Sequence, residues 1–112
     1  MATTVNTLIE AKYAEAVDTV QYVVPASTGA IIDKFTVTNT SANNESITIN
    51  LVESGDVPQP YNRIIDQRLL APLETYTCPE LVGHILLSGD FISTVASTIS
   101  TLSIRASGRQ IT

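Results

Sequence analysis

The sequence predicts an all-β fold, a single antiparallel β-sandwich or jelly-roll-like domain with an N-terminal arm. Three observations support this prediction. First, Leu102, Ile104 and Ala106 alternate with polar residues, and a period of two is typical of a strand with one buried face. Second, 44% of the residues are hydrophobic but only 5% are aromatic, so the core must consist mainly of Ile, Val and Leu. Third, turn-forming residues recur roughly every eight to twelve residues, as expected of a sandwich.

Residues 1–16 are interpreted as an arm and residues 17–112 as the sandwich. The segment Leu8–Ala16 has weak helical spacing, but it is short for an isolated helix, so an extended arm with at most one helical turn is preferred. Such an arm either closes the domain's own sheet or reaches a neighbouring subunit. Leu8 and Ile9 would be exposed apolar groups on a mobile arm unless they dock, which favours a partner.

Seven or eight short strands are expected in the sandwich. The stretches that predict them are residues 18–24, 31–39, 47–51, 63–70, 75–78, 85–87, 91–96 and 101–106. In the second stretch, Ile31, Phe35 and Val37 are expected to point inward, while Lys34 points outward. Asp33 then falls on the inward side, so this strand is expected to enter the core only after Asp33.

The next two strands differ in how clearly their residues alternate. Ile47, Ile49 and Leu51 are separated by polar residues, so these three side chains are predicted to face the core. The strand over residues 63–70 contains a doublet, and either Ile64 or Ile65 is its inward residue.

The loops and the end of the chain complete the pattern. The stretch Ser54–Tyr61 contains two prolines within three residues, which rules out a central strand there. The strands Phe91–Ala96 and Thr101–Ala106 are predicted to form a hairpin, and Ser107–Thr112 is a tail that offers reach to a neighbour. A β-sandwich and a jelly roll both fit, because they differ only in how the strands are connected.

Size and charge limit the classes of function. At 112 residues the chain has room for one domain, and six basic against eleven acidic side chains give a net charge of −5. This charge argues against binding to nucleic acid, which needs a basic surface, and against binding to an anionic membrane. The lone Cys78 leaves no internal disulfide, and no apolar run has the ~20 residues of a membrane span. The N-terminus lacks the features of a signal peptide, so assembly in a cytosol is expected.

No catalytic, cofactor-binding or metal site is predicted. His84 is the only histidine and Cys78 a conceivable nucleophile, but a loop histidine and a small buried cysteine are the favoured interpretations. Asp56, Asp66 and Asp90 lie beside turns, where they could gather a calcium ion, yet they lack the spacing of a calcium-binding loop. Hydrogen bonding within turns explains their positions. The chain is therefore expected to be neither an enzyme nor a cofactor-binding protein.

A family resemblance covers about residues 10–112. The stretches that carry it are Tyr22–Ala26, Ile31–Ser41, Ile47–Gly55, Asn62–Ile65, Leu70–Gly83, Gly89–Ser93 and Ile104–Thr112. In these stretches the chain resembles small virion structural proteins of tailed bacteriophages and prophages. Their shared motifs are turns and core positions, which specify a fold better than a role.

The resemblance implies a non-enzymatic virion protein that is assembled in the host cytoplasm. The role expected first is a capsid decoration or cement protein, a homo-oligomer (dimer or trimer) that clamps neighbouring copies of the major capsid protein. The alternative is a neck, tail or fibre-associated component of the same virion. A host-surface carbohydrate-binding module is less favoured, because the chain has few aromatic residues and no Trp.

The residues expected to contact partners lie in the arm, the proline-containing loop and the tail. They are Leu8, Ile9, Tyr13, Val57, Pro58, Tyr61, Arg109 and Ile111. If the arm is free, truncation of residues 1–13 is expected to weaken assembly and to leave the sandwich folded.

Overall fold

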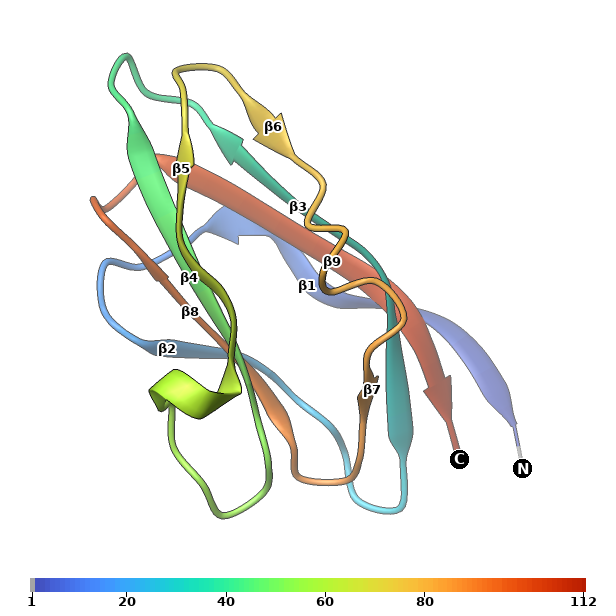
Figure 1. Cartoon of the computed structure of the whole chain (residues 1–112). Helices are drawn as coiled ribbons and strands as arrows, with labels where there is room; N and C mark the ends of the chain where they lie inside the picture. The colour runs from blue at the N-terminus through green and yellow to red at the C-terminus, as the bar shows by residue number, and fades with distance from the viewer. Residues whose placement is uncertain (1) are drawn as a thin grey trace.

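The computed structural model describes residues 2–112, and it confirms the all-β prediction (Figure 1). The described residues form nine strands and one short 3-10 helix. Their bounds are β1 (Thr3–Tyr13), β2 (Thr19–Val23), β3 (Gly29–Asn39), β4 (Glu45–Val52), η1 (Pro60–Asn62), β5 (Arg63–Leu70), β6 (Thr75–Tyr76), β7 (Ile85–Leu86), β8 (Phe91–Ala96) and β9 (Leu102–Ile111).

The strands form two antiparallel sheets with the connections of a jelly roll. Sheet A has the order β1-β9-β3-β6, with β7 also paired to β3, and sheet B has the order β2-β8-β4-β5. The pairs β1·β9, β2·β8, β3·β7 and β4·β5 join the first half of the chain to the second half in reverse order. This is one long antiparallel ribbon rolled into a sandwich, which is the jelly-roll arrangement.

The core lies between the sheets and is aliphatic. Its largest fully buried side chains come mainly from β3, β4, β8 and β9 and include Phe35, Ile32, Ile47, Ile49, Ile92, Leu102 and Ile104. As predicted from their alternation, Ile47 and Ile49 face the core and are fully buried, whereas Leu51 is only partly buried. Burial of one such side chain stabilises the fold by about 1.5–3 kcal/mol.

Residues 3–13 form a strand of the sandwich, which corrects the predicted division into an arm and a separate domain. β1 pairs with β9 from Thr3↔Ile111 to Tyr13↔Ser103. Register shifts on both sides of Ile9 allow the adjacent side chains Leu8 and Ile9 to be buried together, with exposed fractions of 6% and 2%. The prediction that Leu8 and Ile9 contact a partner is therefore wrong, because both belong to the chain's own core.

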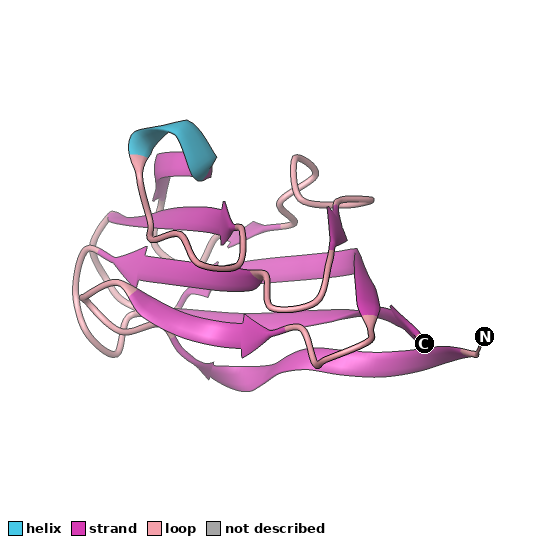
Figure 2. Cartoon of the chain, turned by 90° about the horizontal axis from the view of Figure 1, so that it is seen from below, coloured by secondary structure: helices cyan, strands magenta, loops and turns pink. Residues whose placement is uncertain are grey.

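The two ends of the chain lie together at one end of the sandwich (Figures 1 and 2). The backbone N–H of Ala2 donates to the carbonyl of Thr112, and that of Thr112 donates to the carbonyl of Ala2, both at 2.9 Å. The stretch predicted to be a tail thus belongs to β9 as far as Ile111. Figure 2 also shows the single helical turn, η1, at the outer side of sheet B, directly before β5.

The predicted hairpin of the last two strands does not form. β8 pairs with β2 and β4 in sheet B, whereas β9 pairs with β1 and β3 in sheet A. The turn between them therefore crosses from one sheet to the other. A period of two identifies a strand but does not identify its partner.

A bulge in β3 changes which residues face inward. The register of β3 against β9 shifts between Ile32 and Lys34, so that Asp33 is extra and exposed. Phe35 and Val37 are buried as predicted, but Ile32 and not Ile31 fills the core before the bulge.

Candidate functional site

Exposed apolar side chains gather at the two edges of the sandwich. The β1/β2 edge carries five large ones: Val5, Tyr13, Val17, Val20 and Val23. The β5/β7 edge, which includes β6 and the adjoining loops, carries seven: Val57, Tyr61, Leu69, Leu73, Val82, Ile85 and Leu87. Within residues 2–112, only Ile99 in the β8–β9 turn lies outside these edges, and the central strands β3, β4, β8 and β9 carry none.

The β1/β2 edge is closed between the sheets by side-chain hydrogen bonds. The amide of Gln110 donates to the hydroxyl of Tyr22 at 2.6 Å and accepts from the amide of Asn6 at 2.8 Å. Nearby, the amide of Gln21 donates to the Glu15 carboxylate at 2.9 Å. These bonds join β1 and β9 of sheet A to β2 of sheet B, so the polar network seals this edge.

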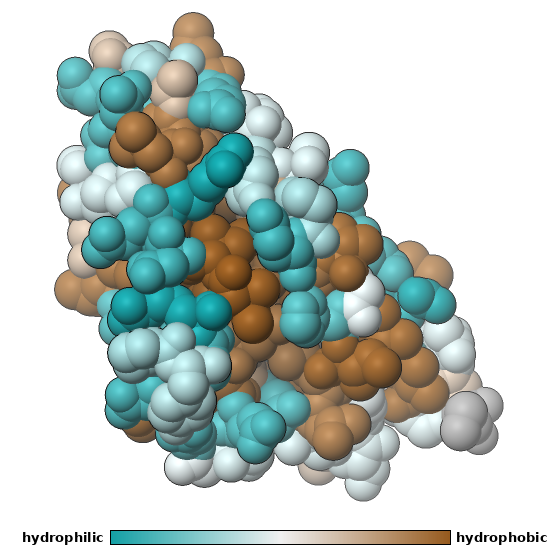
Figure 3. Space-filling view, viewed as in Figure 1, coloured by the Kyte–Doolittle hydropathy of each residue, from teal (hydrophilic) through white to brown (hydrophobic). Residues whose placement is uncertain are grey.

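The β5/β7 edge is open and forms a cleft of about 350 Å³. In Figure 3 the cleft is visible as an apolar hollow between β5 and the β6–β7 segment. The residues that line it are Leu51, Val52, Glu53, Asp56, Tyr61, Asn62, Ile64, His84, Ile85, Leu86 and Asp90.

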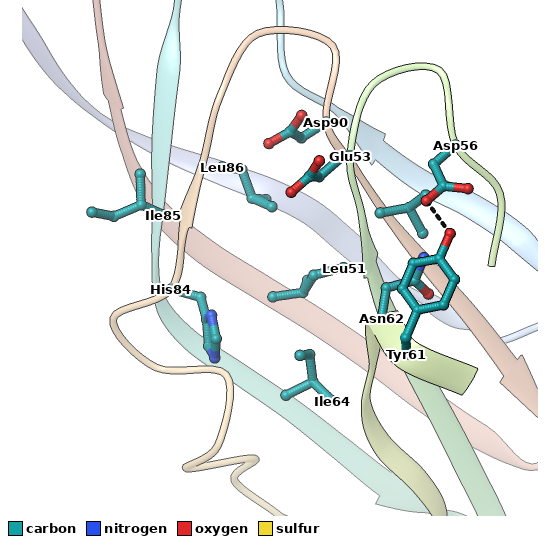
Figure 4. Close-up of a pocket in the computed structure, with 11 residues that line it drawn as sticks. Leu51, Glu53, Asp56, Tyr61, Asn62, Ile64, His84, Ile85, Leu86 and Asp90 are labelled. Atoms are coloured by element: carbon teal, nitrogen blue, oxygen red, sulfur yellow. Dashed lines mark hydrogen bonds between the residues drawn. The ribbon is translucent and has the colours of Figure 1, made fainter. Parts of the chain in front are cut away.

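The apolar floor of the cleft consists of side chains from both sheets (Figure 4). Leu51 comes from β4, Ile64 from β5 and Leu86 from β7. β6 and β7 are only two residues long each, so they cover little of the edge of sheet A. Leu51 and Ile64 remain partly exposed in the cleft, whereas Leu86 is buried beneath it. Of the doublet Ile64–Ile65, Ile65 is buried in the core, and Ile64 is the half-buried member that lines the cleft.

Helix η1 forms one wall of the cleft and is held on β4 by amide groups. The buried side-chain amide of Asn50 donates to the Asn62 side-chain oxygen at 2.6 Å and to the Gln59 carbonyl at 3.0 Å. The Asn62 amide in turn donates to the carbonyl of Val57 at 3.0 Å. These bonds fix the loop on which Tyr61 is exposed.

Three carboxylates lie at one end of the cleft, away from Ile64 (Figure 4). They are Glu53, Asp56 and Asp90. The ion pairs among residues 2–112 are Lys12–Glu15, Arg63–Asp66 and Arg109–Asp33, so none of these carboxylates has a basic partner in this part of the chain. The end of the cleft beside β8 is therefore negatively charged.

Hydrogen bonds fix two of these carboxylates. Asp90 accepts backbone N–H groups from Ser54 at 3.0 Å and from Leu87 at 2.9 Å. Asp56 accepts the hydroxyl of Tyr61, and the hydrogen bond from this hydroxyl lowers the pKa of Asp56 below its usual range. The same bond raises the pKa of Tyr61, so the pair holds a neutral phenol beside a charged carboxylate.

A second contact between the sheets closes the far end of the β5/β7 edge. The guanidinium of Arg68, on β5, lies 4.3 Å from the ring centre of Tyr76, on β6. The Tyr76 hydroxyl donates to Glu80, and burial followed by this hydrogen bond raises the pKa of Tyr76 to about 12. The edge is therefore bridged at β6 and open beside β7.

The structure places the predicted contact residues at separate positions. Tyr61 lines the cleft, and Val57 and Pro58 precede it on the same loop. Tyr13 is half exposed on β1, at the opposite edge of the sandwich.

The two predicted contacts near the C-terminus lie on β9. Arg109 is exposed, and its guanidinium binds the Asp33 carboxylate through Nε at 3.0 Å and Nη2 at 2.9 Å. Ile111 is partly buried between Thr3 and Gly29. Neither residue lies at the cleft.

The residues considered for catalysis or metal binding are also apart. Cys78 is fully buried, and burial, with a smaller effect of the negative charge of Glu80, raises the pKa of its thiol to about 12. His84 is exposed on the wall of the cleft. Among residues 2–112, no group of three or more His, Cys, Asp or Glu side chains is arranged to hold a metal ion. None of the helical residues within 2–112 forms a helix that is long and apolar enough to cross a membrane.

Sequence reasoning missed most of the cleft, although two signals for it were present. The doublet Ile64–Ile65 and the run Ile85–Leu87 place apolar side chains on both faces of short strands, so one face must remain outside the core. Comparison of the chain with protein-family models, with curated proteins and with solved structures found no match, so the site is assigned from its own geometry.

Proposed function

We propose that the chain is a non-enzymatic virion structural protein, a capsid decoration or cement protein that clamps neighbouring copies of the major capsid protein. The observation that carries the proposal is the placement of exposed apolar side chains at two opposite edges of one small sandwich. A contact surface at each edge allows one subunit to join two neighbours. Apolar area at such surfaces provides the main driving force for association.

The composition of the rest of the surface supports this proposal. Ser and Thr side chains such as Thr36, Thr38 and Ser103 occupy the outer side of the central strands of sheet A, where they are partly exposed. The same face also carries exposed charged residues, namely Lys34, Arg105 and the Arg109–Asp33 ion pair. It is therefore polar, and it leaves the apolar contacts to the edges. The resemblance to small virion proteins of tailed phages points to the same role.

The test is the copy number of the chain in purified particles of the phage or prophage that encodes it, measured by quantitative mass spectrometry against the major capsid protein. A cement role requires hundreds of copies, because the shell repeats one contact over its whole surface. About six to twelve copies would instead place the protein at the neck or tail, where the symmetry is low-order. Absence of the protein from the particles would reject a virion role.

A host-surface carbohydrate-binding module is the second candidate, and Tyr61 is the observation that favours it. The ring is 75% exposed at the mouth of the cleft, beside Asp56 and Asn62, and an exposed ring with polar neighbours suits a sugar. Binding of the isolated protein to cell-wall glycans, lost in Tyr61→Ala, would support this function. Unchanged glycan retention in Tyr61→Ala would reject it.

A further inference from the structure

We propose that the cleft at the β5/β7 edge binds an extended peptide segment in which an aliphatic side chain is followed closely by Lys or Arg. The aliphatic side chain packs on Leu51, Ile64 and Leu86. The basic side chain reaches the carboxylates at the other end of the cleft. The inference rests on the proposed function in one respect only: if the chain is a cement protein, the segment belongs to the major capsid protein.

The cleft has two chemically different ends, which require two different side chains. The floor is aliphatic and comes from β4, β5 and β7, so it favours a side chain without polar groups. Glu53, Asp56 and Asp90 lie together at the other end (Figure 4). A ligand that spans the cleft must therefore be amphipathic.

Charge complementarity identifies the polar part of this ligand as a cation. No Lys or Arg of residues 2–112 lines the cleft, and the ion pairs of the chain lie elsewhere. Asp56 is charged at neutral pH, and the hydrogen bond from Tyr61 lowers its pKa further. A basic side chain of the partner would provide the missing counter-charge, and the net charge of −5 would also attract a basic segment before contact.

The backbone beside the cleft favours a peptide as the carrier of these groups. Among residues 2–112, β5 pairs only with β4 and β7 only with β3, so each strand has a free edge at the opening of the sandwich. An extended segment can pair with such an edge while its alternate side chains enter the cleft, which is the mode of β-strand addition. The segment would complete an edge that β6 and β7 cover with only two residues each.

The test uses the full-length protein and a yeast-displayed library of random seven-residue peptides. Peptides enriched by the wild type should carry Leu, Ile or Val within two positions of Lys or Arg. Their affinity should fall at least tenfold in Glu53→Lys and in Ile85→Ser, two exposed positions in the lining of the cleft. Matched controls are Glu10→Lys on β1 and Ile99→Ser in the β8–β9 turn, which make the same changes outside the cleft and should leave binding unchanged.

Several results would overturn the inference. These are the absence of enriched peptides, enrichment of acidic or purely apolar peptides, and an equal loss of binding in the control variants. Dimerisation of the wild type that Ile85→Ser abolishes, seen by sedimentation, would show that a second copy occupies the cleft. The copy number of the protein on particles is measured separately, so the two proposals can fail independently. Abundant protein on particles without enrichment of peptides would reject only the cleft assignment. Enrichment of peptides without protein on particles would reject only the virion role.

Discussion

At the acidic end of the cleft, the charge of one residue depends on one hydroxyl group. The hydrogen bond from Tyr61 lowers the pKa of Asp56 below its ordinary value of 3.8. Tyr61→Phe removes this bond, so the pKa of Asp56 is expected to rise toward 3.8. Measurement of the carboxyl shift by NMR as a function of pH tests this, with Glu80, which accepts from Tyr76, as the internal control.

The same bond has a pH-dependent effect on stability. The pKa of Asp56 is lower in the folded state than in the unfolded state, so the charged carboxylate stabilises the folded protein. This contribution is complete above the unfolded-state pKa and is lost as the pH falls through the folded-state pKa. In Tyr61→Phe, the fall of unfolding free energy below about pH 4 should therefore be shallower than in the wild type. If the unfolding free energy of Tyr61→Phe falls with decreasing pH as steeply as that of the wild type, and the pKa of Asp56 does not change, the bond does not form in solution.

Gly108 is a residue at which a single methyl group cannot be accommodated. A Cβ there would lie 2.0 Å from the carbonyl oxygen of Ile31 and 3.0 Å from Leu8. Gly108→Ala is expected to lower the free energy of unfolding by about 1–3 kcal/mol or more, because the backbone of β3 must move. Urea unfolding measures this, and Gly29→Ala is the control, since its nearest neighbour is at 3.8 Å and it should be nearly neutral. Equal stability of the two variants would contradict the close contact of β9 with β3.

At the scale of elements, β1 is an intrinsic part of the fold. Leu8→Ala and Ile9→Ala should each lower the free energy of unfolding by about 2–5 kcal/mol, because both side chains are buried in the core. Val5→Ala, on the same strand but 83% exposed, should stay within about 0.5 kcal/mol of the wild type. Truncation of residues 1–13 is now expected to unfold the protein, and a truncated chain that melts like the wild type would show that β1 is dispensable.

Element positions could be predicted from the sequence, because runs of apolar and β-branched residues are separated by turn-forming residues. β5 and β8 begin and end at the predicted residues, Arg63–Leu70 and Phe91–Ala96. Partners and bulges could not be predicted, since they depend on the strand alongside. Because of the bulge at Asp33, Ile32 and not Ile31 is the core residue. The bulged strand β1 buries Leu8 and Ile9, the apolar pair from which contact with a partner was predicted.

The cleft could not be predicted from the sequence for a related reason. It exists because β6 and β7 are shorter than the stretches that predicted them, 75–78 and 85–87. β6 ends before the loop from Cys78 to Gly83, in which Leu81 is buried and both Cys78 and Gly83 have positive φ angles. β7 begins at the predicted residue and ends before the turn at Gly89, which also has a positive φ angle. Of the predicted contact residues, Tyr61 alone lines the cleft, and those predicted in the arm and the tail lie on β1 and β9, away from it.

At the scale of the whole molecule, the jelly roll explains why exposed apolar side chains gather at two edges. Rolling the ribbon places β1 and β2 at one side of both sheets, and β5 with β6 and β7 at the other. The two edges lie on opposite sides of the sandwich and are built differently: polar side chains close one, and the other opens into a cleft. A subunit built in this way can make two different contacts with a repeating shell.

A clamp of this kind predicts that each edge is needed separately. Val20→Asp changes the β1/β2 edge and Ile85→Asp the β5/β7 edge, and both side chains are more than half exposed, so the fold should be retained. Each variant is expected to bind particles at least tenfold more weakly, because a buried and unpaired charge opposes the contact. Ile99→Asp, equally exposed but outside both edges, should bind like the wild type. The measurement is the number of bound copies per particle over a range of protein concentrations. Loss of binding in only one edge variant would indicate a single attachment surface. Loss of binding in Ile99→Asp would show that the edges are not the contact surfaces.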